Sequence, residues 1–313
     1  MAGSRQHVLP RFLLRGFQSR ISGNQIYTWV QRKGRASFET NILNAFVEGK
    51  FYEAAEVNVD DDITNLENRF APIIDGLRKE TSSRTISNSE IPELVVHLSI
   101  RTKNLRDSFF AASNYVFKGL ITYMEDPKNL HTMLCRAIKR RSRWWRELVD
   151  EKRKTSGLSR KQFEMFVPRL EEEVLSSTIL PRAALIEVAL IRQVFEENLE
   201  RLMKDGHLKS LSKGLIPQPR LELYKKLNWH LIKLEKGSLI LGDAGPIHQV
   251  GQEFKALPDG EDVIQSVYLP IGDSHVLTGT MLEAVPFVDP EVVNNGESTS
   301  AREVRHWIKS GCG

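Results

Sequence analysis

The chain has 313 residues, with 44 Lys and Arg against 40 Asp and Glu, so its formal net charge is +4 at pH 7. A hydrophobic content of 41% and a charged content of 27% exclude a wholly disordered or low-complexity protein. No apolar run approaches the roughly 18–20 residues of a membrane-spanning helix, and the first residues contain no signal-peptide core. The two cysteines, Cys135 and Cys312, are too few for a disulfide framework or a cysteine zinc site. We therefore expect a soluble globular protein of the cytoplasm, with no membrane partner.

Extended segments and one short helix are predicted at the start of the chain. Apolar residues at helical spacing predict a short helix over residues 7–17. Alternating apolar residues predict strands over 24–31 and 38–42. The three aspartates at 60–62 are candidate caps for a helix over 63–79.

Helices are predicted through the middle of the chain. Ser89 and Pro92 open a helix that we expect to continue to Met124. Three further helices are expected between Leu130 and Lys204. Beyond this region the pattern predicts strands over residues 228–235, 238–241, 263–269 and 275–278.

Strands at both ends of a helical middle predict an α+β fold, in which the N-terminal hairpin joins a C-terminal β-sheet. We expect one domain over residues 1–313. Its expected parts are N-terminal β elements in 1–60, a helical region in 61–215, C-terminal β elements in 216–290, and a C-terminal helix and tail in 291–313.

Positive charge is concentrated in the segment from Arg136 to Lys154, where nine basic residues stand against three acidic ones. Trp144 and Trp145 interrupt the run, and cations mixed with aromatic faces can contact phosphates and stack on bases. The alternative is the solvated face of a helix with its tryptophan pair turned inward. The residues predicted to bind nucleic acid are Arg136, Lys139, Arg140, Arg141, Arg143, Trp144 and Arg146.

Four polar residues are candidate catalytic groups. His7 can carry a proton at neutral pH, although it can equally cap or pack against a helix. Glu67 borders the apolar face of its predicted helix, and Arg101 is its expected partner, either in a structural bridge or in a site for an anionic substrate. Asp243 follows an apolar strand and precedes a turn, a position that suits a functional group or an Asx turn.

The opening of the chain follows the pattern H-x-x-P-x-F-x-L-x-x-F from His7 to Phe17. Together with later segments in the same order, this start resembles the domain of unknown function 4238 family, which is mostly bacterial. The later segments are Asn41–Tyr52, the helix with Glu67, Arg101-Thr102, Trp229, Leu239–Ile247 and Tyr268–Ile271. Gly242 and Ala244 stand where the family usually has Ser and Asn, so chemistry that needs those polar groups is not expected.

Sharper catalytic motifs are absent from the sequence. It contains no phosphate-binding loop, no G-x-G-x-x-G, no H-E-x-x-H and no G-x-S-x-G. These absences argue against kinase, dehydrogenase, zincin and α/β-hydrolase functions.

Two hypotheses from different classes remain. The first is a phosphodiester hydrolase acting on nucleic acid, an RNase or nuclease in bacterial defence or stress. Arg101 would hold the anionic group, His7 or Glu67 would move the proton, and Asp243 would orient the base or bind a divalent metal ion. The second is a non-catalytic module that binds RNA, DNA or an acidic protein through the segment Arg136–Lys154.

Overall fold

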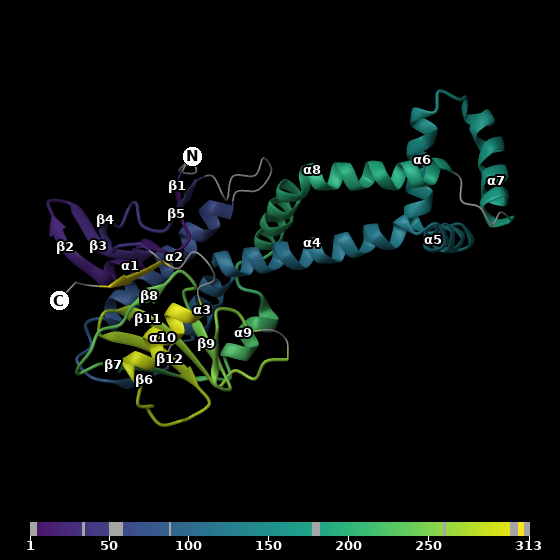
Figure 1. Ribbon diagram of the computed structural model, residues 1–313. Helices are drawn as coiled ribbons and strands as arrows, with labels where there is room; N and C mark the ends of the chain where they lie inside the picture. Colours follow the sequence, from purple (N-terminus) through teal and green to yellow (C-terminus); the bar gives the residue numbers. More distant parts are fainter. Residues whose placement is uncertain are drawn as a thin grey trace. The chain divides into compact units, whose positions relative to one another are not determined.

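Two long helices, α4 (Lys103–Glu125) and α8 (Arg182–Ser212), carry the chain out of one compact unit and back into it (Figure 1). The first unit combines residues 1–109 with 204–313, and the second is residues 110–203. The computed structural model describes residues 5–32, 35–49, 59–87, 89–176, 182–258, 261–300 and 306–309.

A six-stranded antiparallel sheet is the largest element of the first unit. Its strands are β6 (Arg84–Ile86), β7 (Asn228–Lys233), β9 (Ile247–Val250), β10 (Glu253–Lys255), β11 (Ser266–Gly272) and β12 (His275–Thr280), in the order β10-β9-β11-β12-β7-β6. Leu277 of β12 lies opposite Leu231 of β7 and Leu269 of β11, and all three side chains are fully buried. This row of leucines places one face of the sheet against the hydrophobic core.

A second sheet joins the two ends of the chain. Its strands are β2 (Gln18–Ser22), β3 (Gln25–Arg32), β4 (Phe38–Asn41), β8 (Leu241–Gly242) and β13 (His306–Lys309). The order is β2-β3-β13-β8, with β4 also paired to β3. Gly23, at φ +58°, permits the tight turn between β2 and β3. The prediction that the N-terminal hairpin joins C-terminal strands is therefore confirmed, and so is the α+β class.

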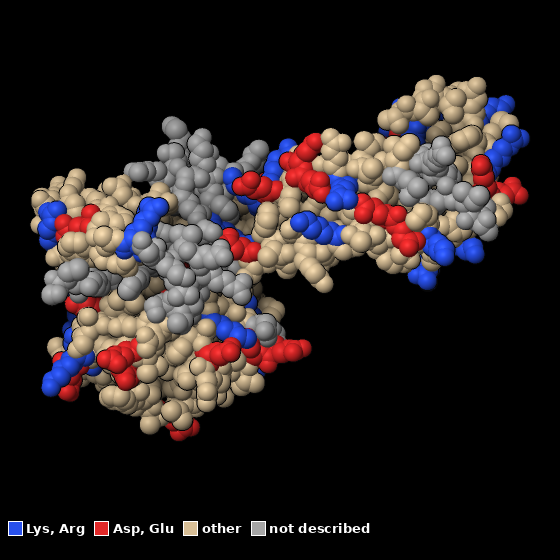
Figure 2. Space-filling model, viewed as in Figure 1, with Lys and Arg blue, Asp and Glu red and all other residues tan. Residues whose placement is uncertain are grey.

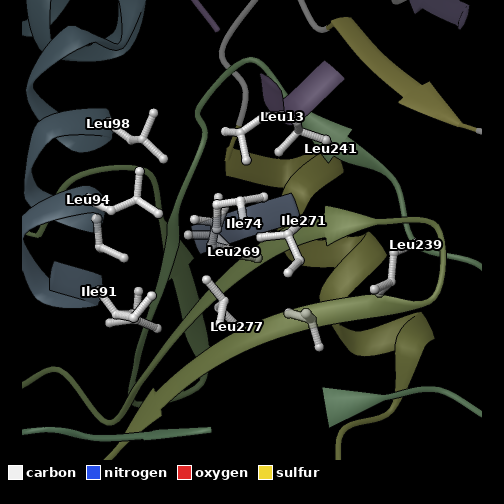
Figure 3. Packing of buried hydrophobic residues seen from close by; sticks show 14 of the residues in the cluster. Leu13, Ile74, Ile91, Leu94, Leu98, Leu239, Leu241, Leu269, Ile271 and Leu277 are labelled. Atoms are coloured by element: carbon white, nitrogen blue, oxygen red, sulfur yellow. The ribbon is translucent and has the colours of Figure 1, made fainter. Parts of the chain in front are cut away.

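Short and long helices cover the sheets of the first unit. They are α1 (Arg11–Leu14), the 3-10 helix η1 (Arg15–Phe17), α2 (Val59–Leu77), α3 (Glu90–Arg101), α9 (Gln218–Tyr224) and α10 (Pro290–Ser300), and a small strand pair is formed by β1 (Arg5–His7) and β5 (Val47–Gly49). Figure 3 shows Leu94 and Leu98 of α3 facing Leu269 of β11, with Ile74 of α2 and Leu13 of α1 beside them. Burial of these apolar side chains is what holds the helices on the sheet.

The described residues of the second unit form helices joined by short connections, and none of them is in a strand. Besides most of α4 and α8 it contains α5 (Pro127–Lys139), α6 (Arg143–Thr155) and α7 (Arg160–Ser176). Its core is formed by Leu130, Leu134, Ile138, Trp145, Val174 and Val188. Among the described residues of the whole chain, no helix has both the length and the apolar character needed to cross a membrane.

Several predicted boundaries were wrong for identifiable reasons. The helix expected from Ser89 to Met124 is two helices, because Thr102 is extended at ψ 145° and separates α3 from α4. Four helices occupy the region where three were expected, since Arg141 takes a positive φ of 42° and Ser142 caps the start of α6. The strand expected over 238–241 is confined to Leu241–Gly242.

Candidate functional site

Arg101 is the centre of a buried polar cluster in the first unit. It ends α3, and its side chain is 2% exposed. Its Nη1 donates to Oε1 of Glu67 on α2 and lies 3.2 Å from Nε2 of His97, one turn earlier on α3. Its Nη2 donates to the backbone carbonyl of His7 at 2.8 Å. The guanidinium thus ties α2, α3 and β1 together.

His97 is a member of this cluster to which the sequence assigned no role of its own. Its side chain is fully buried. Burial and, secondarily, the charge of Arg101 hold the pKa of His97 well below its usual value. Because a guanidinium can only donate, the neutral imidazole accepts the hydrogen bond at Nε2. The signal in the sequence was the spacing of four residues between His97 and Arg101, which places both on one helix face.

The remaining two predicted catalytic residues stand at the edge of this cluster. His7 contributes its backbone carbonyl, while Nδ1 of its half-buried ring lies 3.2 Å from the carbonyl of Ala45. Asp243 lies in the turn after β8, whose Gly245 is close enough to α3 that a Cβ there would lie 4.0 Å from Thr102. The structure therefore joins His7, Glu67 and Arg101 directly and places the Asp243 turn near the end of α3.

Glu297 of α10 is a buried acid that sequence reasoning missed. Its side chain is 1% exposed, and its Oε2 accepts the backbone N–H of Gly242 at 2.9 Å. Burial, with a smaller effect from the negative charge of Asp243, raises the pKa of Glu297 well above its usual value. Asn294, one turn earlier on α10, accepts the N–H of Ile240 at 2.9 Å, so the two side chains hold the backbone of β8 and of the residue before it.

The contact with Glu297 explains why a glycine stands at position 242. A Cβ at Gly242 would lie 2.5 Å from Oε2 of Glu297 and 3.1 Å from its backbone oxygen. A serine there would have to displace the Glu297 carboxylate that accepts the Gly242 N–H, and it would crowd the backbone of α10. Among the residues that the structure describes, no three His, Cys, Asp or Glu side chains gather to hold a metal ion.

The basic segment lies in the second unit, on α5, α6 and the turn between them. All seven residues predicted to bind nucleic acid are exposed: Arg136, Lys139, Arg140, Arg141, Arg143, Trp144 and Arg146. Figure 2 shows blue Lys and Arg side chains at the end of this unit that carries α5, α6 and α7. We call these seven residues the basic face.

The two tryptophans have different environments. Trp144 is 50% exposed, whereas Trp145 is 6% exposed and donates its indole N–H to Oε1 of Glu171 on α7 at 2.8 Å. The inward-facing alternative for the pair is therefore correct for Trp145 only. Arg143, which precedes them, forms an exposed ion pair of 2.7 Å with Glu147.

The two sheets, their covering helices and the helical second unit define an α+β protein with an exposed basic helical segment. The family described as Protein of unknown function (DUF4238) matches residues 5–299, and the chain belongs to this family. The match spans both units, so the helical unit lies within the matched region. No curated protein and no solved structure matches the chain.

Proposed function

We propose that this protein binds nucleic acid through the basic face of α5 and α6. The observation that carries the proposal is that all seven side chains of the basic face are exposed, whereas the adjacent Trp145 is buried and anchors α6. Clustered Lys and Arg side chains attract a phosphate backbone and displace its counterions. We also infer a cytoplasmic location, where RNA and DNA are accessible.

The spacing of the cations favours a backbone that runs along both helices. Arg136 and Lys139 lie three residues apart on α5, and Arg143 and Arg146 have the same spacing on α6, so each pair shares one side of its helix. Trp144 stands between the second pair with half of its surface exposed. An exposed indole can stack on any unpaired base, which favours a single-stranded ligand.

Binding of a labelled single-stranded RNA and DNA across a salt series tests this proposal. The triple variant Arg136→Glu, Arg140→Glu and Arg146→Glu should weaken binding by about tenfold or more and reduce the salt slope by about one for each phosphate that it no longer neutralises. The matched control reverses three exposed charges elsewhere in the same unit, Lys118, Lys161 and Arg169. The proposal is wrong if neither nucleic acid binds at low salt, or if both triple variants lose affinity equally.

A phosphodiester hydrolase is the second candidate function. The observation that favours it is that the Glu67 carboxylate and the His7 backbone carbonyl both bond the guanidinium of Arg101. The burial of Arg101 favours a structural bridge instead, because a substrate phosphate would have to displace these partners. Cleavage of RNA or DNA, measured with and without Mg²⁺ or Mn²⁺ and abolished in a folded Asp243→Ala variant, would support the hydrolase; absence of cleavage under both conditions would reject it.

A further inference from the structure

The helices α4 and α8 pack against each other within the second unit and bury one seam of apolar side chains. The rings of Phe117 on α4 and Phe195 on α8 are stacked. Ile121 and Val188 are also buried, at 4% and 5% exposure. Glu125, which follows Phe117 on α4, pairs at 2.7 Å with Arg192, which precedes Phe195 on α8, so the two helices run antiparallel (Figure 1).

A second set of apolar side chains on the same two helices is exposed. On α4, Val116, Leu120 and Tyr123 each directly precede a residue of the buried seam, and on α8 Val194 directly precedes Phe195. Their exposure is 67% for Val116, 44% for Leu120, 43% for Tyr123 and 58% for Val194, with Leu190 at 49% and Ile191 at 45% beside them on α8. We call these six residues the apolar face.

The apolar residues of the two helices lie on one side of the pair. Successive residues of an α-helix lie about 100° apart around its axis. The residue that precedes a seam residue in the sequence therefore lies on one flank of the helix, and the residue that follows it lies on the other flank. Antiparallel helices that face each other present these preceding residues on the same side. The opposite flank is polar, since Arg192 bonds both Glu125 and Glu196 there, at 2.7 and 3.0 Å.

We infer that the apolar face is the contact between two copies of this chain, which would pair their α4–α8 hairpins as a four-helix bundle. Six side chains, each about half exposed, present several hundred Å², as much as the largest apolar patch of an ordinary monomer. Two such faces together reach the roughly 1,200 Å² at which specific interfaces begin. A symmetric dimer buries the same patch on both copies, so no second partner surface is required.

The charge pattern of α4 favours a second copy of the chain over nucleic acid as the partner of the apolar face. Between Ser108 and Met124 the only charged residue is Lys118, and it follows the seam residue Phe117, on the polar flank. The apolar face itself contains no charge, so it neither attracts a phosphate backbone nor repels an identical copy. Pairing of helical hairpins through a second apolar stripe is a common route to a bundle core. This inference does not depend on the proposed nucleic-acid binding.

Light scattering coupled to size-exclusion chromatography of the full chain, over a range of micromolar concentrations, tests the inference. We expect a dimer for the wild type. Leu120→Glu and, on the other helix, Val194→Glu should each halve the measured mass while the helical circular dichroism signal is retained. The matched control is Thr122→Glu, which adds the same charge to α4 at an exposed position on the opposite flank and should leave the dimer intact.

Three results would overturn the inference. They are a monomeric wild type over the whole concentration range, a folded Leu120→Glu or Val194→Glu variant that keeps the dimer mass, and dissociation of the Thr122→Glu control to the same extent. Mixing Val194→Glu with Val194→Lys provides an independent check, because opposite charges on facing copies should restore the dimer mass. Failure of both variants to fold leaves the wild-type mass and its concentration dependence as the deciding measurement: a dimer supports the inference and a monomer rejects it.

Discussion

Trp145 on α6 donates its indole N–H to Oε1 of Glu171 on α7, across 2.8 Å. This bond satisfies the one polar atom of an otherwise buried ring and sets the rotation of α6 about its own axis. Because neighbouring residues on a helix point about 100° apart, the same rotation turns Trp144 toward solvent. Burial of Trp145 in the core of the helical unit, together with this hydrogen bond, thereby leaves Trp144 as the tryptophan available to a ligand.

Substitution of the two tryptophans should separate stability from binding. Trp145→Ala removes a buried ring and should lower the free energy of unfolding of the helical unit by about 3–5 kcal/mol. Trp144→Ala should change it by no more than about 0.5 kcal/mol, but should weaken binding of single-stranded nucleic acid by about 1–3 kcal/mol because the indole no longer stacks on a base. Urea unfolding and fluorescence anisotropy measure the two effects. Equal destabilisation by both variants would contradict the assignment.

The Arg101 cluster should behave as a structural bridge. Arg101→Met removes the donor to Glu67 and to the His7 carbonyl and should destabilise the fold by about 3 kcal/mol, the lower end of the range for buried pairs because Glu67 is 24% exposed. Adding Glu67→Gln to Arg101→Met should cause little further loss, as a double-mutant cycle in urea would show. Arg69→Met is the control: its ion pairs with Glu90 and Glu93 are partly exposed to solvent, and it should cost less than about 1 kcal/mol. A loss of similar size in both single variants would count against the bridge.

Gly16 is required by the close approach of the backbone of β11 and the side chain of Arg78. A Cβ at Gly16 would overlap the carbonyl oxygen of Ile271 and lie 2.7 Å from Nη2 of Arg78. Arg78 itself bonds that carbonyl at 2.5 Å and the carbonyl of Leu13 at 3.0 Å. Gly16→Ala must displace these groups and should lower the unfolding free energy by about 1–3 kcal/mol or more.

The control for this prediction is Gly76→Ala in α2. A Cβ there meets no atom within 4 Å, and alanine is the better helix former, so thermal stability should be unchanged or slightly higher. Thermal unfolding followed by circular dichroism measures both variants. Tolerance of alanine at position 16 would show that η1 packs loosely on β11.

The buried carboxyl of Glu297 predicts a defined pH dependence. Its pKa in the folded state is raised above the unfolded value, so the folded state holds a proton that the unfolded state has lost. The contribution of Glu297 to the free energy of unfolding is fully present below the pKa of this carboxyl in the unfolded state, near 4.3. The contribution is lost as the pH rises through its pKa in the folded state. Glu297→Gln keeps an acceptor for the Gly242 N–H and cannot ionise. The variant should therefore exceed the wild type in melting temperature at about pH 8 and lose that advantage near about pH 4.5.

Two variants serve as comparisons for the pH experiment. Glu291→Gln changes an exposed acid in the first turn of the same helix and should show no pH-dependent difference from the wild type. Asp243→Asn removes a neighbouring negative charge that contributes to the raised pKa of Glu297. In this variant the loss of stability on ionisation of Glu297 should therefore end at a lower pH than in the wild type. A parallel pH profile for wild type and Glu297→Gln would refute the prediction.

The elements that the sequence predicted well are those whose signal is local. Alternation over 24–31 and helical spacing over 63–79 each reflect one face of one element, so β3 at 25–32 and α2 at 59–77 are found close to their predicted bounds. β6 and β9 were missed because they are short and owe their strand conformation to pairing with β7 and β11. The division between α3 and α4 at Thr102 was also missed, since no glycine or proline marks it.

The candidate sites show the same division between local and long-range information. The basic segment could be recognised from the sequence, because clustered charges on adjacent helix turns are exposed in almost any packing. The pairing of Glu67 with Arg101 could also be predicted, since Glu67 borders an apolar face and needs an opposite charge. The folded structure was needed to show that Arg101 also holds the His7 carbonyl, that Glu297 lies against Gly242 from 55 residues away, and that Trp145 is buried while Trp144 is not. These contacts join residues distant in sequence, whose meeting depends on how whole elements pack and leaves no local pattern.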